Sequence, residues 1–551
     1  MKTKITVLIL LSVFFALTLS SALRTSGTVD EIAHHIPVGY VLLTKWDFKM
    51  GTDSPPLARY IIALPLKLFM KITIPADKDQ WRRADRSSFG RDFFYKYNTE
   101  PKKMLFFGRI PVIVIAVLCG LLLFIWAASL YGNSAGLLSL FLYCFSPVVI
   151  AHSGLATADA ITAFFIFLAA YAFWLFLSDM TIKKMIFAGI LLGLAQLCKY
   201  NAILLYPVFL LLLLFELPLV SKWEKGVIAA KFMAIIAISA IVIWCGYGFD
   251  IQPIFKDTAH VEEKIRIAHN IILKFAPHFS DFKGIDKFLS QSPVPLGTYI
   301  LGIMGVFRHS YEGHAAYFMG NWFAGGNKLY FLTAFLIKNP LPMLIMFLTG
   351  IFITCKNGVS RAERIFLLII GVFFIVSSFG RLQIGIRHLL PLYPFCFMIT
   401  GRSAALLKKR YLDVVFVVLM VWQVAATFVV WPNYIGYFNE LVGGPGFGYK
   451  YLRDSNLDWG QDLPALSSYM KKNDIKEITL DYFGQADPSS YGISYSEFQP
   501  NDFERPGDKL YAISVQYLES VKWTKGYKPN TIAGSSIFIY DLRKRTLDER
   551  E

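Results

Sequence analysis

The chain has 551 residues, of which 55% are hydrophobic and 17% are charged. A soluble protein of this length cannot bury so much apolar surface in one core, whereas a bilayer accepts apolar surface directly. The formal net charge is +16, but the basic residues form no single stripe or domain, which argues against a nucleic-acid-binding protein. The sequence therefore predicts an integral membrane protein surrounded by lipid.

Cysteine chemistry contributes little to this prediction. The six cysteines lie in or at the ends of apolar segments, and none is spaced as CxxC. A disulfide framework and a zinc site are both disfavoured.

Apolar stretches of about twenty residues predict membrane-spanning helices. We expect eleven of them, along the chain at 5–23, 104–130, 134–151, 158–178, 182–198, 201–220, 227–248, 330–354, 365–380, 387–406 and 411–430. The first stretch also fits a cleaved signal peptide, because Ser20, Ser21 and Ala22 are small. Both alternatives place residue 24 outside the cytoplasm.

The distribution of Lys and Arg orients the chain in the plasma membrane. With a cytoplasmic N-terminus, most Lys and Arg of the short loops lie on the cytoplasmic side, and the short outer loops hold only Lys199, Arg381 and Arg387. Three longer segments, 24–103, 249–329 and 431–551, then lie on the extracytoplasmic side. We expect an all-α transmembrane domain over 1–430, followed by a small soluble α/β domain over 431–551 with short β-like runs.

A pair of acids follows the first apolar stretch. Asp30 and Glu31 come a few residues after the helix, at the headgroup plane, where two carboxylates are costly unless they are solvated, paired or used. An ordinary solvated loop is the alternative. The turn Asp53-Ser54-Pro55-Pro56-Leu57-Ala58-Arg59 follows, and its tandem prolines indicate a built loop that leads into an amphipathic or re-entrant segment.

A second acid lies in a very short outer turn. The sequence from His152 to Asp159 connects two spans. Asp159 could simply cap the next helix, a common role that does not exclude a second one.

Cations that break the positive-inside pattern lie on the same side. Lys199, Arg381, Arg387 and His388 occur at outer span ends. Snorkelling to the outer headgroups would explain each one singly. Together with the acidic loops they indicate a site for a lipid-borne phosphate, which Arg binds through a planar fork.

The order of these motifs resembles the multispanning glycosyltransferases of the GT-C fold, and within them the protein O-mannosyltransferases and the lipid A aminoarabinose transferase. The resemblance covers most of residues 1–490. It rests on Asp30-Glu31, Pro55-Pro56-Leu57 and Asp159, and on four later motifs: Gly313-His314-Ala315-Ala316-Tyr317, Lys338-Asn339-Pro340-Leu341-Pro342, Tyr437-Phe438-Asn439-Glu440-Leu441 and Asp454-Ser455-Asn456-Leu457-Asp458-Trp459-Gly460-Gln461-Asp462. Ser54 stands where mannosyltransferases often have His, which leaves the sugar open.

The resemblance implies a polyprenyl-phosphate-linked sugar as donor and transfer to an extracytoplasmic acceptor, which could be a protein, a lipid or a glycan. It implies that Asp30 is the general base and that Glu31 and Asp159 line the same cavity. The donor and its phosphate would be bound by a set of polar side chains: Lys199, Arg381, Arg387, His388, His152 and Arg59. Some relatives bind a divalent metal ion, for which the candidate ligands are Asp30, Glu31 and His34.

Two other functions stay open. A lipid flippase or transporter would place ionisable or helix-breaking residues near mid-span, often in two matching halves, whereas here the polar residues gather at outer span ends. A non-catalytic envelope assembly subunit is the second.

The acids between Asp454 and Asp462 do not complete a calcium loop of the EF-hand type, since Ala465 occupies the twelfth position. A structural turn is favoured for this segment. Trp459 within it could stack on a sugar ring.

Overall fold

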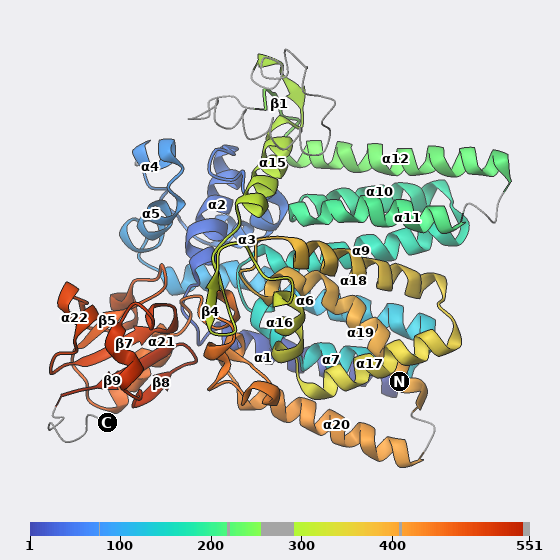
Figure 1. Ribbon diagram of the computed structural model, residues 1–551. Helices are drawn as coiled ribbons and strands as arrows, with labels where there is room; N and C mark the ends of the chain where they lie inside the picture. Colours follow the sequence, from blue (N-terminus) through green and yellow to red (C-terminus); the bar gives the residue numbers. More distant parts are fainter. Residues whose placement is uncertain (77, 217–220, 255–290, 407–409, 544–551) are drawn as a thin grey trace.

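The computed structural model describes residues 1–76, 78–216, 221–254, 291–406 and 410–543. It shows a bundle of long helices that lie side by side, with the remaining elements gathered at one end (Figure 1). The N-terminus lies at the far end of the bundle from the C-terminal sheet (Figure 1). The segment between the first two long helices, the described part of the loop before residue 329 and the tail therefore share one end of the molecule.

The helices of the bundle follow the predicted apolar stretches. They are α1 (Lys2–Ala22), α6 (Pro101–Tyr131), α7 (Asn133–Cys144), α8 (Pro147–Ser153), α9 (Ala158–Asp179), α10 (Ile182–Gln196), α11 (Leu205–Glu216), α12 (Lys222–Gly246), α16 (Tyr330–Lys338), α17 (Leu341–Asn357), α18 (Arg361–Phe379), α19 (Tyr393–Gly401) and α20 (Arg410–Val429). α1 packs against α6 and α7, and its Phe14 is fully buried. The prediction of a polytopic helical membrane protein is confirmed.

The number of spans differs from the predicted eleven. Within the described residues, seven helices are long and apolar enough to cross a membrane, and nine if two bent pairs count as one span each. α7 and α8 meet at 63°, and α16 and α17 meet at 114°. Prolines explain both breaks, because Pro147 begins α8 and Pro340 precedes α17, and proline cannot continue a preceding helix. α10 has 15 residues, which is shorter than a bilayer requires, and the apolar helix Tyr200–Glu216 that contains α11 has 17 described residues, at the lower limit for a span.

The segment after α1 forms a set of short helices at the end of the bundle. These are α2 (Ile36–Lys45), α3 (Pro56–Phe69), α4 (Lys78–Arg83) and α5 (Arg86–Arg91). As expected from the tandem prolines, α3 begins at Pro56 and buries one face, including Ile62 and Leu66, while Leu68 is exposed. The later loop adds α15 (Gly297–Glu312), the pair β1 (Ile251–Gln252) and β2 (Val294–Pro295), and the hairpin of β3 (Ala316–Phe318) and β4 (Asn321–Phe323).

The tail contains a five-stranded mixed sheet with the order β6-β5-β7-β9-β8. Its strands are β5 (Ile478–Asp481), β6 (Tyr495–Glu497), β7 (Leu510–Ser514), β8 (Thr531–Ala533) and β9 (Ile537–Asp541), accompanied by α21 (Leu463–Lys472) and α22 (Pro500–Glu504). β5 runs parallel to β6 and β7, and β9 pairs antiparallel with β7 and β8. The short β-like runs of the sequence thus form strands, whereas the domain boundary at 430/431 stays a prediction.

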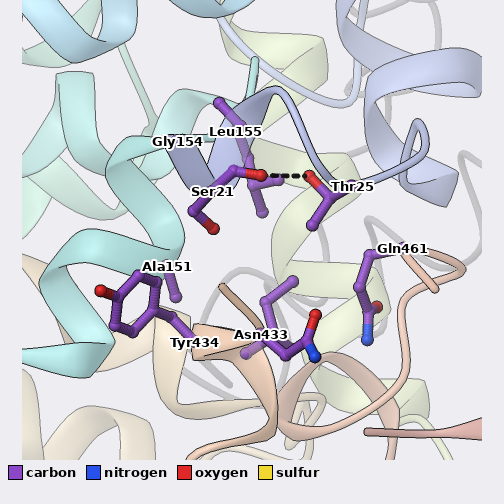
Figure 2. Close-up of a pocket in the computed structure, with 10 residues that line it drawn as sticks. Ser21, Thr25, Ala151, Gly154, Leu155, Asn433, Tyr434 and Gln461 are labelled. Carbon is purple, nitrogen blue, oxygen red and sulfur yellow. Dashed lines mark hydrogen bonds between the residues drawn. The ribbon is translucent and has the colours of Figure 1, made fainter. Parts of the chain in front are cut away.

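Backbone hydrogen bonds connect the tail to the residues that follow α1. Ser26 donates its backbone N–H to the carbonyl of Gln461, and Val29 donates to the carbonyl of Trp459. Figure 2 shows the neighbouring joint, where Ser21 and Thr25 face Asn433, Tyr434 and Gln461. The void there has a volume of only about 10 Å³, room for one water at most. This joint is therefore a packing contact.

Candidate active site

Asp30 lies where the chain leaves α1 and starts a single turn of π-helix, η1 (Glu31–His35). Such turns are rare and recur at functional sites, because they re-aim side chains within a helical segment. Here the turn directs Asp30 to Arg387 and Glu31 to Arg109.

Four charged residues meet beside this turn and form what we call the ionic cluster. Nη1 of Arg387 lies 2.6 Å from Oδ2 of Asp30 and 3.8 Å from Oδ2 of Asp159. Nζ of Lys199 lies 2.6 Å from Oδ1 of Asp159. The residues come from four places in the chain, since Asp159 is in the first turn of α9, Lys199 follows α10, and Arg387 is in the 3-10 helix Ile386–Leu392. The sequence left open whether Asp159 only caps the next helix. In the structure its carboxylate accepts a hydrogen bond from Lys199.

The ionic cluster is open at two of its members. The side chains of Asp30 and Lys199 are 21% and 26% exposed, whereas those of Arg387 and Asp159 are 9% and 3% exposed. Burial raises the pKa of Asp30, but the guanidinium of Arg387 and the neighbouring His34 and His35 outweigh it and hold the value at about 2. Asp30 is thus a carboxylate at neutral pH. Among the residues described, Nε of Arg387 is buried and has no hydrogen-bond partner.

Glu31 faces away from the ionic cluster and is fully buried. Its carboxylate accepts from Nε and Nη2 of Arg109, each at 2.7 Å, from the N–H of Ala156 at 2.7 Å and from Thr28. Burial raises the pKa of Glu31, but Arg109 and these hydrogen bonds lower it overall. Both carboxylate oxygens are therefore engaged in holding the turn, and Glu31 has a structural position beside the site.

Arg109 is a residue that sequence reasoning missed. It lies in α6 with its side chain 3% exposed. Besides Glu31 it donates to the carbonyl oxygens of Ala22, Thr25 and Ser26 at 2.5–3.2 Å. One guanidinium thus holds the end of α1 and the residues that lead to Asp30 together. Lys cannot reproduce these contacts, because it lacks the planar fork of donors.

Trp459 supports Arg387 from the tail. The Arg387 guanidinium carbon lies 4.1 Å from the centre of the Trp459 ring, a cation–π contact. The same ring meets His152 edge to face, with centroids 6.3 Å apart. Stacking of Trp459 on a sugar stays a prediction, and its observed partner is Arg387.

The segment before Trp459 fixes the backbone that carries Arg387. The side-chain oxygen of Asn456 accepts the N–H of Ile386 at 2.8 Å, and the Ser455 hydroxyl donates to the carbonyl of Ile384. Gly385 has φ +148°, and a Cβ at this position would collide with the Ser455 hydroxyl. Only glycine permits this approach. The tail therefore builds one wall of the site.

Two predicted substrate-binding cations have other partners. Arg59 is fully buried and donates to Asp53 and to the carbonyl oxygens of Gly51 and Ser54. Arg381 is exposed and donates to the carbonyl of Tyr311. Within the described residues the ion pairs of the ionic cluster include Lys199 and Arg387 and neither of these two, whose role in binding stays a prediction.

The predicted histidines are near the ionic cluster without an ion pair to it. His152 is 2% exposed, and its Nδ1 has no hydrogen-bond partner among the described residues. His388 is partly buried beside Phe331, with ring centroids 6.3 Å apart. Their role in binding stays a prediction.

Each of the three candidate metal ligands pairs with a different protein side chain. Asp30 pairs with Arg387, Glu31 with Arg109, and Nδ1 of His34 lies 3.4 Å from Asp53. Within the described part of the chain, His, Cys, Asp and Glu form no group of three that could hold a metal ion. As arranged, this donor set does not fit a metal, and we derive no step through one.

Asp458 and Asp462 of the 454–462 segment accept hydrogen bonds from protein groups. Asp458 accepts from the hydroxyl of Ser514 and the N–H of Gly460, and Asp462 accepts from Ser535 and Ser536. The favoured interpretation as a structural turn agrees with these contacts.

Comparisons with known proteins show what the chain is similar to. Residues 102–244 match the family model described as dolichyl-phosphate-mannose-protein mannosyltransferase. A search of the curated proteins finds no match. Among solved structures, ArnT from Cupriavidus metallidurans bound to undecaprenyl phosphate aligns with TM-score 0.47 and 10% identity, over 97% of this chain and 97% of that chain. The Archaeoglobus fulgidus oligosaccharyltransferase in its apo form aligns with TM-score 0.43 and 13% identity, over 78% of this chain and 55% of that chain.

The family match, in a chain of this membrane architecture, indicates a membrane-embedded glycosyltransferase. Its matched segment, which runs from α6 through most of α12, is similar to the protein mannosyltransferases. That segment contains Arg109, Asp159 and Lys199.

Proposed function

We propose that the chain transfers a sugar from a polyprenyl-phosphate donor to an acceptor on the extracytoplasmic side of the plasma membrane. The single observation that carries the proposal is the ionic cluster, in which Arg387 bridges the carboxylates of Asp30 and Asp159. A phosphate could replace a carboxylate as the partner of this guanidinium, because it offers the same paired oxygens. The matching family model is named for a sugar carried on dolichyl phosphate, a lipid phosphate of this chemistry.

In this mechanism Arg387 and Lys199 bind the donor phosphate, and Asp30 is the general base. Arg387 lies 2.6 Å from Asp30 and helps to hold its pKa at about 2, which makes Asp30 a weak base in this pairing. When Arg387 turns to the phosphate, the pKa of Asp30 rises and its carboxylate becomes able to accept the proton of the acceptor. The acceptor atom forms a bond to the anomeric carbon from the face opposite the phosphate, the carbon–oxygen bond to phosphate breaks, and polyprenyl phosphate leaves with its charge stabilised by both cations.

Glu31 takes the role of a positioning residue in this proposal. Its carboxylate is engaged by Arg109, Ala156 and Thr28, so it acts through the placement of Asp30. Asp159 likewise holds Lys199 at the site.

The experiment incubates purified full-length protein with labelled polyprenyl-phosphate sugars and an envelope extract from cells that lack the protein. We expect release of free polyprenyl phosphate in step with labelling of an extract component. Movement of the labelled lipid across vesicles without bond cleavage would instead identify a flippase. Neither cleavage nor movement, with a panel of hexose and pentose donors, would leave a non-catalytic assembly role and overturn the proposal.

A further inference from the structure

A cleft with a volume of about 670 Å³ lies between the segment that precedes α6 and the C-terminal sheet. One wall comes from residues 91–96, and the other comes from residues 480–488, β6, Phe498 and Phe503 of α22. This is a volume typical of small-ligand sites. The proposed transfer mechanism makes no use of this cleft.

Aromatic rings cover both walls of the cleft. They are Tyr95 on the first wall and Tyr482, Tyr495, Phe498 and Phe503 on the second. All five pack against the core with part of their surface and stay partly exposed with the rest, so each ring offers some surface to the cleft. An uncovered ring face packs against the C–H face of a sugar ring, because both surfaces are flat and weakly polar, with the ring quadrupole facing the C–H groups.

Carboxylates stand between these rings. Asp92, Asp481, Asp487 and Glu497 all line the cleft. Asp481 ends β5, burial raises its pKa to about 6, and no ion pair of Asp481 occurs among the described residues. Carboxylate oxygens accept hydrogen bonds from sugar hydroxyls, and aromatic platforms with a few such acceptors make a site for a polyol.

The shape and charge of the cleft disfavour a peptide. β6 is the edge strand of the sheet, but Tyr495 and Glu497 are two residues apart, so they project from the same face. The side chains that β6 contributes to the cleft therefore come from one face of the sheet, and strand addition would instead use the free main-chain edge of β6. Arg91 and Lys96 on the opposite wall offset part of the negative charge that a basic peptide would need.

One loop separates the cleft from the ionic cluster. Tyr482, in the cleft wall, donates its hydroxyl to the carbonyl of Gly460, and the preceding Trp459 stacks on Arg387. On the other wall, burial raises the pKa of Tyr95, and the charges of Tyr491, Asp487 and the buried Glu31 raise it further. The cleft and the ionic cluster therefore share one loop, and the cleft also lies within reach of the Glu31 charge.

We propose that this cleft binds a saccharide, the glycan part of the acceptor, and holds it beside the ionic cluster. The binding claim stands on the cleft alone, whereas its assignment to the acceptor rests on the proposed function.

The binding arm of the test uses saturation-transfer NMR on the full-length protein in detergent, with maltoheptaose and chitohexaose as saccharide probes and a lysine-rich octapeptide as the rival. We expect saturation transfer to at least one saccharide, reduced about tenfold in apparent affinity by Tyr495→Ala. Tyr469→Ala is the matched control, because Tyr469 is partly exposed in α21 and does not line the cleft. Binding of the peptide alone, or of no probe, would overturn the proposal.

The transfer arm blocks the cleft covalently. The exposed cysteines are first removed by Cys245→Ser and Cys355→Ser. Glu497→Cys is then modified with a polyethylene glycol maleimide. Glu504→Cys, exposed at the end of α22, is the control. We expect the modified Glu497→Cys protein to bind polyprenyl phosphate normally but to lose transfer to the envelope extract. Full transfer would contradict the acceptor assignment. Absence of transfer in the unmodified protein would count against the proposed function, while the NMR result would still decide the cleft.

Discussion

Glu31 and Arg109, 78 residues apart in the chain, form a buried ion pair in which two guanidinium nitrogens each lie 2.7 Å from a carboxylate oxygen. The side chains are 0% and 3% exposed. This pair ties the turn that carries Asp30 to α6. It therefore separates the role of Glu31 from that of its neighbour, although the two acids are adjacent in sequence.

Removing one partner of this pair leaves a buried charge uncompensated. We expect Glu31→Gln or Arg109→Gln alone to lower the free energy of unfolding by about 3–5 kcal/mol. The double variant Glu31→Gln with Arg109→Gln should be less destabilised than the sum of the single variants. Thermal unfolding in detergent, followed by tryptophan fluorescence, measures all three. Single variants as stable as the wild type would contradict the structural role assigned to the pair.

The Trp459 ring should matter for donor affinity, because it backs the guanidinium that holds the phosphate. We expect Trp459→Leu to raise KM for the donor by about tenfold, consistent with a buried cation–π contact of roughly 1–2 kcal/mol. Trp431→Leu is a matched control, since Trp431 stacks on Arg24 with 4.7 Å between the guanidinium carbon and the ring centre, away from the ionic cluster. A normal donor KM in Trp459→Leu would remove this residue from the site.

The sequence allowed prediction of the ionic cluster but not of its supports. Asp30, Asp159, Lys199 and Arg387 lie at span ends, and topology alone places such ends on one side of a bilayer. Arg109 escaped this reasoning because it lies within a long apolar stretch near its start, where a snorkelling cation is ordinary.

The position of Trp459 beside Arg387 could not be predicted from the sequence either. It lies 72 residues after Arg387 and follows a separate turn, so their contact depends on how the tail docks. The short apolar stretches also misled the span count, because composition shows hydrophobicity and not where a proline bends a helix, as at α16 and α17.

The cations predicted to bind phosphate are separated by the structure into two groups. We expect Lys199→Gln to weaken donor binding by about tenfold, because its charge lies at the open side of the ionic cluster. Arg381→Gln should leave donor binding unchanged, since Arg381 contacts Tyr311 instead. Binding of polyprenyl phosphate, measured by quenching of intrinsic fluorescence, compares the two. Equal losses in both variants would contradict the boundary drawn around the site.

Stability should fall as pH rises through neutrality because of Asp458. Burial raises the pKa of this acid to about 7 in the folded protein, above about 3.9 in an unfolded chain. Between these values the folded state binds one more proton at Asp458, so the contribution of this group to stability is fully present below about pH 4 and declines by about 1.4 kcal/mol per pH unit until about pH 7.

Asp458→Asn removes this titration, and its amide can still accept from Gly460 and meet Ser514. We expect the variant to show a flatter dependence of the unfolding midpoint on pH between about 4 and 7, and to be more stable than the wild type at about pH 8. Parallel curves for the two proteins would show that Asp458 is ionised in the folded state at lower pH.

The central claim is that Asp30 accepts the acceptor's proton while Arg387 holds the donor phosphate. The most direct test measures donor binding and sugar transfer in the same preparation of Asp30→Asn, with the exposed Asp474→Asn as control. We expect Asp30→Asn to bind polyprenyl phosphate at least as tightly as the wild type, because Arg387 is released from its ion pair, and to lose transfer by a factor of about 10²–10⁴. Full transfer by a correctly inserted Asp30→Asn protein would contradict the claim.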